Sequence, residues 1–103
     1  MDIKNGKNSV RVVVIDSGIC SFHDFGESII GGIGIDELDG KCTVINNFED
    51  EIGHGTAVVD ILLKTAPHVK VFCVKIFDND IVTSFNKLCY ALEYVYENID
   101  CEI

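Results

Sequence analysis

Val-Val-Val-Ile-Asp-Ser-Gly, at residues 12–18, is the segment from which the fold of this chain is most directly inferred. The apolar run begins at Val10, and only Arg11 interrupts it. A short apolar run without alternation is typical of a strand buried on both faces of a parallel sheet. The run ends abruptly at Asp16, and the Ser-Gly that follows supplies a turn by which the backbone leaves the sheet. Because reactive groups gather outside the carboxyl ends of such strands, Asp16 is a candidate site residue.

A second informative segment, Gly-His-Gly-Thr, occupies residues 53–56. Apolar residues recur with helical period after it, and the Thr-Ala-Pro at 65–67 ends the pattern, which predicts a helix over 54–64. His54 then projects from a helix N-terminus, where the helix dipole disfavours the imidazolium ion. A nearby carboxylate would reverse that bias and hold the ring in one tautomer. We therefore expect Asp16 to orient His54 as a general base.

The remaining pattern predicts further elements of an α/β fold. Paired glycines suggest a short, bent strand at 29–33 within an irregular segment over 20–40, and another short extended piece is expected at 43–45. Alternation predicts a strand at 69–77. A helix capped by Thr83 or Ser84 and stopped by Asn98 follows, with one apolar stripe, and residues 99–103 begin a last strand. The expected architecture is a partial doubly wound parallel sheet in three layers, with three to four strands and two main helices.

Composition limits the classes of function. The chain has 103 residues with 48% hydrophobic content, enough for one domain with a real core. A net charge of −9 with scattered basic residues argues against a nucleic-acid partner and against an anionic membrane surface. Residues 1–7 show no secretory signal, and no apolar run approaches a membrane span. Five cysteines without a Cys-x-x-Cys pair predict reduced thiols and a cytoplasmic location.

Two other kinds of protein are less consistent with these motifs. Asp-Ser-Gly after an apolar strand also occurs in aspartic proteases, but those need a second such segment and an all-β pattern. A nucleotide-binding α/β domain would need a glycine-rich phosphate loop directly after the first strand. The glycines at 31–34 come too late in the chain, and no helix follows them.

Taken in order, the segments resemble the subtilisin-like serine proteases, the subtilases. Residues 12–19 look like the catalytic-Asp strand of that family, and Gly-His-Gly-Thr-Ala-Val at 53–58 looks like its catalytic-His motif. Four other segments are similar to family motifs, at residues 21–24, 30–32, 66–76 and 92–95. The resemblance covers residues 10–103, and it implies that Asp16 is the orienting acid and His54 the general base. The whole chain, 1–103, would be the N-terminal part of a subtilase-like peptidase domain.

The chain also departs from the family pattern. The substrate-binding strand, the oxyanion-hole Asn and the Gly-Thr-Ser helix with the nucleophile would lie beyond Ile103, so we expect this chain alone to be inactive. Ala57 replaces a non-catalytic His of the motif, and Asp60 stands where the family keeps a glycine. The loop that holds calcium in many secreted subtilases is missing, and the three histidines lack zinc-ligand spacing, so no cofactor or metal is expected.

Two functions follow as hypotheses. The first is the N-terminal portion of a subtilisin-like endopeptidase that hydrolyses a peptide or protein substrate and is completed by another segment or chain. The alternative is a non-catalytic, degenerate subtilase-like module that binds a peptide or protein partner. In both cases the incomplete sheet predicts a complementing chain or self-association through an exposed edge.

Overall fold

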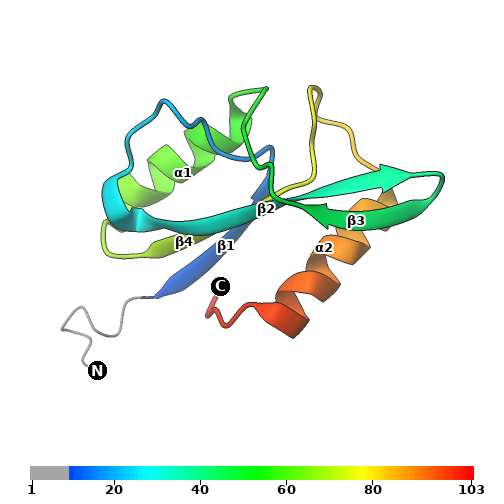
Figure 1. Cartoon of the computed structure of the whole chain (residues 1–103). Helices are drawn as coiled ribbons and strands as arrows, with labels where there is room; N and C mark the ends of the chain where they lie inside the picture. Colours follow the sequence, from blue (N-terminus) through cyan, green and yellow to red (C-terminus); the bar gives the residue numbers. More distant parts are fainter. Residues whose placement is uncertain (1–9) are drawn as a thin grey trace.

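The computed structural model describes residues 10–103, which form an α/β fold around one four-stranded sheet (Figure 1). The strands stand in the order β1-β4-β2-β3, and β4 runs parallel to both of its neighbours, β1 and β2. The elements in chain order are β1 (Arg11–Asp16), the 3-10 turn η2 (Gly26–Ser28), β2 (Ile29–Leu38), β3 (Lys41–Ile45), α1 (His54–Thr65), β4 (Lys70–Lys75) and α2 (Phe85–Asn98). The predicted fold class and both main helices are confirmed.

The two helices cover opposite faces of the sheet and make three layers (Figure 1). Alternate residues of β1 and β4 enter the two cores, because successive side chains of a strand point to opposite faces. The core beneath α1 is formed around Val12, Val59, Val71 and Cys73, and the core beneath α2 around Ile33, Ile35, Val74 and Ala91. Each buried valine or isoleucine contributes roughly 1.5–3 kcal/mol. The unbroken apolar run of β1 therefore reflects burial on both faces, as predicted.

The segment over 20–40 differs from expectation. A short strand in irregular chain was predicted, whereas β2 runs for ten residues and pairs antiparallel with β3. The hairpin turn is Asp39-Gly40, and both residues have positive φ, 52° and 79°. Asp-Gly is a strong signal for a two-residue hairpin turn, and its two positive φ angles match the twist of the strands. The sheet is therefore mostly parallel, with β3 as an antiparallel strand at its edge, and the expected bend appears as a register shift between Ile29 and Gly31.

The C-terminal residues lie along the outer edge of β1, where a last strand was expected to begin. The amide of Val13 donates to the carbonyl of Ile103 at 2.8 Å, and the amide of Glu102 donates to the carbonyl of Arg11 at 3.0 Å. Residues 101–103 form too few such bonds to count as a strand. Beyond this contact, β1 has β4 as its only neighbour in the sheet among residues 10–103.

Candidate functional site

Asp16 and His54 meet at the corner where β1 ends and α1 begins. Nδ1 of His54 lies 2.9 Å from Oδ1 and 3.0 Å from Oδ2 of Asp16. The Asp16 side chain is 12% exposed, while the imidazole is 50% exposed. The structure thus brings together the two residues that the sequence singled out, with the carboxylate behind the ring and the ring facing solvent.

The geometry sets the proton positions on the His54 ring. An ionised carboxylate only accepts hydrogen bonds, so the proton of the neutral ring is assigned to Nδ1. Nε2 is then left with its lone pair on the half-exposed side of the ring. This is the arrangement that a general base requires, because the accessible nitrogen accepts a proton while the carboxylate stabilises the imidazolium that forms.

Two glycines allow the backbone of α1 to approach the end of β1. A Cβ on Gly55 would overlap the carbonyl oxygen of Gly18, so only glycine fits this contact. Gly18 has a φ of 101°, a conformation that residues with a side chain rarely adopt. A Cβ there would also overlap the carbonyl oxygen of Phe48. The glycine after His54 therefore allows close backbone packing.

Asp50 is a residue of this corner that the sequence reasoning missed. Its Oδ1 accepts hydrogen bonds from the Ser17 hydroxyl (2.8 Å) and from the amides of Ile52 (3.0 Å) and Gly53 (2.8 Å). Its Oδ2 accepts from the amide (2.9 Å) and the hydroxyl (2.5 Å) of Thr56. Asp50 lies four residues before the start of α1, outside the usual spacing of a capping residue. Its neighbours Glu49 and Glu51 are also acidic, so the segment is typical of a solvated loop.

The ionised form of Asp50 is strongly favoured. Partial burial opposes ionisation, but hydrogen bonds from the Thr56 hydroxyl and from the amides of Gly53, Thr56 and Ile52 outweigh it. The pKa of Asp50 is therefore held well below its usual range. A negative charge at this position also suits the positive end of the α1 dipole.

Lys75, the last residue of β4, is a buried cation next to Asp16 in the strand ladder. Its Nζ donates to the carbonyl oxygen of Glu49 at 2.5 Å and lies 4.0 Å from the carboxylate of Glu51. This contact ties the acidic loop before α1 to the sheet. A lysine at the end of this largely apolar strand was not recognised as an anchor from the sequence.

Two serines of the described chain, Ser17 and Ser84, have structural roles. Ser17 is fully buried, and its hydroxyl accepts from the amide of Gly55 at 2.8 Å while donating to Asp50. Ser84 caps α2 by accepting from the amide of Lys87, as one of the two predicted caps. Among residues 10–103, no hydroxyl group is hydrogen-bonded to His54. The described residues thus hold an acid and a base without a nucleophile beside them; Ser9 lies outside the described range.

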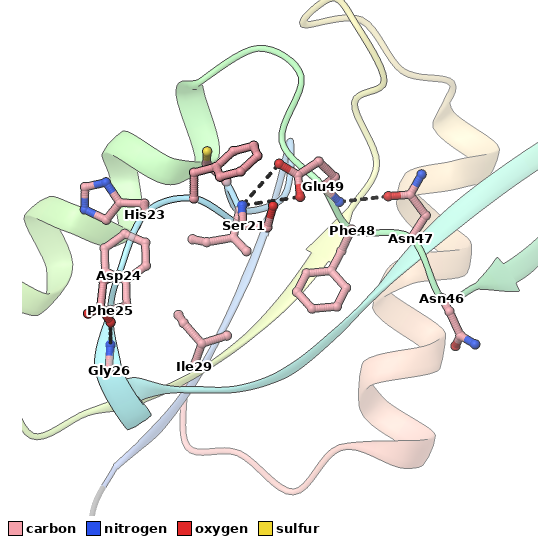
Figure 2. A pocket seen from close by; sticks show the side chains of 13 residues that line it. Ser21, His23, Asp24, Phe25, Gly26, Ile29, Asn46, Asn47, Phe48 and Glu49 are labelled. Carbon is pink, nitrogen blue, oxygen red and sulfur yellow. Dashed lines mark hydrogen bonds between the residues drawn. The ribbon is translucent and has the colours of Figure 1, made fainter.

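A cavity of about 590 Å³ lies beside this corner, between the loops at 19–26 and 46–49. The side chains of Ile29 and Phe48 point into it, and Phe25 lies at its edge (Figure 2). On its rim, the amide of Ser21 donates to the carboxylate of Glu49 (Figure 2). Neither Asp16 nor His54 lines this cavity, so it is separate from the acid–base pair.

The described residues were also compared with the expectations about metal ions, membrane spans and cysteines. Within residues 10–103, no three His, Cys, Asp or Glu side chains are grouped as ligands of a metal ion. No described helix has the length and apolar character to cross a membrane. All five cysteines are free thiols, and burial raises the pKa of Cys73 to about 12.

Asp60 lies on the partly exposed side of α1. Its carboxylate lies 3.0 Å from Nζ of Lys64, one helical turn along the chain, and 3.7 Å from Nε2 of His23. The Asp60 side chain therefore makes its contacts at the surface of α1.

Comparisons of the sequence with models of known protein families and with curated proteins found no match.

Proposed function

We propose that this chain carries the acid and base of a subtilase-type serine endopeptidase, with a serine nucleophile supplied by a further segment or chain. The observation that carries the proposal is the bifurcated contact between Nδ1 of His54 and both carboxylate oxygens of Asp16, on an imidazole that is 50% exposed. The order of acid before base along the chain is that of subtilisin-type triads. The motifs around both residues support the same reading.

The reaction would use the pair in two steps. Nε2 of His54 removes the proton from the serine hydroxyl as the oxygen attacks the peptide carbonyl, and Asp16 stabilises the imidazolium. The imidazolium then gives its proton to the leaving amine, which leaves an acyl-enzyme. Water then attacks the acyl carbonyl as Nε2 takes its proton. The imidazolium returns that proton to the serine oxygen as the ester bond breaks, which releases the acid product and regenerates the serine and the neutral imidazole. Residues 10–103 supply only the proton-transfer part of this sequence.

We also propose that another polypeptide segment extends the sheet at β1. Among residues 10–103, the outer edge of β1 is paired only near residues 11–13, where the C-terminal residues bind it. On α2, an outward stripe of large apolar side chains stays exposed, namely Phe85 at 78%, Leu92 at 52% and Tyr96 at 89%. Unpaired strand edges and exposed apolar patches mark sites of association. The further strand at β1 would come either from a complementing chain or from a second copy of this chain. Analytical ultracentrifugation over a concentration series distinguishes these two sources.

The proposed location is the cytoplasm, which the five free thiols support. A substrate there would be a peptide or protein, since a net charge of −9 opposes binding to nucleic acid.

The experiment that tests the function is fluorophosphonate labelling of a native extract, followed by the intact mass of every species that contains this sequence. A labelled species larger than 11.4 kDa, or a labelled partner that co-purifies, is the expected result. Labelling must be lost in His54→Ala. An unlabelled 11.4 kDa species alone would contradict the peptidase and favour the alternative, a non-catalytic module that binds a peptide or protein partner.

A further inference from the structure

Asp50 connects the two elements that carry the acid and the base. On one side its Oδ1 accepts from the hydroxyl of Ser17, the residue directly after Asp16. On the other side its Oδ2 accepts from both the amide and the hydroxyl of Thr56, in the first turn of α1. One carboxylate therefore joins the end of β1 to the start of α1.

Ser17 passes this connection on to the acid–base pair. Its amide donates to Oδ1 of Asp16 at 2.7 Å, and its hydroxyl accepts from the amide of Gly55, the residue after His54, at 2.8 Å. The Ser17 hydroxyl has a single proton, and its oxygen accepts from the amide of Gly55. The proton must therefore point to a separate hydrogen-bond acceptor. Asp50 is that acceptor at 2.8 Å. The bond between the Ser17 hydroxyl and the residue after His54 thus depends on Asp50, while the amide of the same serine holds Oδ1 of Asp16.

Helix capping alone does not account for these contacts. A cap needs to accept only from amides of the first turn, as Asp50 does from Thr56. The bond from Ser17 comes from outside the helix and joins Asp50 to the end of β1. The position of α1 is limited from the other side by Gly55, where any Cβ would overlap the Gly18 carbonyl. Backbone contact thus prevents closer approach, and the bonds of Asp50 prevent separation.

We propose that Asp50 is a positioning residue for the Asp16–His54 pair, acting through Ser17 and Thr56 to hold Nδ1 of His54 on the Asp16 carboxylate. Asp50 touches neither the imidazole nor a reacting atom, and its effect is transmitted through hydrogen bonds. The consequence for catalysis rests on the peptidase function proposed above, whereas the effect on the His54 ring does not.

The test measures the tautomer of His54 by two-bond ¹H–¹⁵N correlation in the labelled chain, at alkaline pH where imidazole is neutral. Wild-type protein is expected to hold the proton on Nδ1, and Asp16→Asn is the reference for loss of that state. Asp50→Asn is expected to shift the equilibrium toward the Nε2–H tautomer. Glu51→Gln is the matched control, because it removes one charge from the next residue of the same loop and should leave the wild-type tautomer. A folded Asp50→Asn with the wild-type tautomer would overturn the proposal.

A second pair of variants applies if Asp50→Asn does not fold. Thr56→Val removes the hydroxyl that donates to Asp50 and keeps the shape, whereas Thr56→Ser keeps the hydroxyl. A tautomer shift in Thr56→Val that Thr56→Ser restores supports the proposal, and a wild-type tautomer in Thr56→Val contradicts it.

Steady-state kinetics of the completed peptidase test the positioning role of Asp50 independently. Asp50→Asn should lower kcat on the order of 10- to 100-fold with little change in KM, since misplacement of a reacting group has effects of this size. Glu51→Gln should have neither effect. If wild-type protein has no activity but the tautomer results hold, the peptidase proposal fails and the positioning role stands.

Discussion

The two helices begin in different ways, although each is tied to the sheet by a serine hydroxyl that donates to a carboxylate. At α2 the serine is Ser84, which also caps the helix itself and donates to Glu37 of β2. At α1 the serine is Ser17, which belongs to the strand end, and the carboxylate is Asp50 in the preceding loop. The residue before α1 is Gly53, which has no capping side chain.

This difference shows how a reactive residue can occupy the first position of a helix. A local cap such as Ser84 satisfies the first turn of α2 with its own side chain. At α1 the first-turn amide of Thr56 is instead bound by Asp50, which lies in the preceding loop. The first position of the helix is therefore free for His54, and the next for the close backbone contact of Gly55. The corner with the acid–base pair therefore depends on residues from three segments, whereas the start of α2 is nearly local.

The largest expected difference between the two helix starts is in activity. In the completed peptidase, His54→Ala should lower kcat by about 10⁶-fold, because members of a triad act as a unit. Asn86→Ala, in the first turn of α2, should leave kcat within about twofold, since it removes only a 3.3 Å bond to Glu37. Steady-state kinetics with one peptide substrate checks both. A comparable loss in Asn86→Ala would show that the two corners are not functionally distinct.

The next effect is on stability. Asp50→Ala should lower the free energy of unfolding by about 2–4 kcal/mol, because it leaves five donors, four of them in part-buried contacts, without an acceptor. Glu37→Ala should cost only about 1 kcal/mol, since Glu37 accepts two bonds, from Ser84 and Asn86. Urea unfolding of both variants tests this order. Equal losses would mean that the tie at α1 is no stronger than the tie at α2.

The contribution of Asp50 should depend on pH in a defined direction. Its pKa in the folded protein is lowered, so its charged form adds stability that is fully present above the unfolded-state pKa of about 3.9. That stability is lost as pH falls below this value toward the folded pKa. The stability difference between wild type and Asp50→Asn should therefore be constant at neutral pH, about 1–2 kcal/mol, and shrink in acid. A difference that grows in acid would contradict this assignment.

The smallest expected effect is at the local cap of α2. Ser84→Ala should cost about 1 kcal/mol in unfolding free energy, typical of an N-cap, and Ser84→Thr should recover part of it, because its hydroxyl can accept from Lys87 and donate to Glu37. Neither change should alter the tautomer of His54, because Ser84 contacts Glu37 and the α2 first turn only. A tautomer change in Ser84→Ala would show that the two helix starts are coupled through the sheet.

Several features of the fold and the site could be predicted from local sequence patterns. The strand before Asp16, the helix after His54 and the helix after Ser84 were predicted because burial on both faces and helical period leave clear signatures. Asp16 and His54 were found for the same reason, since each stands at the boundary of such an element. The β2–β3 hairpin was missed, although Asp39-Gly40 is a recognisable turn signal.

What the tertiary structure alone revealed is the role of residues whose partners are distant in sequence. Asp50 and Lys75 carry no periodic signal, because one lies in an acidic loop and the other in an apolar strand. Their hydrogen bonds to Ser17, Thr56 and Glu49 exist only after the sheet has brought β1, β4 and the loop before α1 together. Local sequence determines which elements form and where a reactive side chain stands at their ends. The packing of those elements determines which buried polar groups hold that side chain in place, because a buried donor or acceptor must find its partner wherever the fold supplies one.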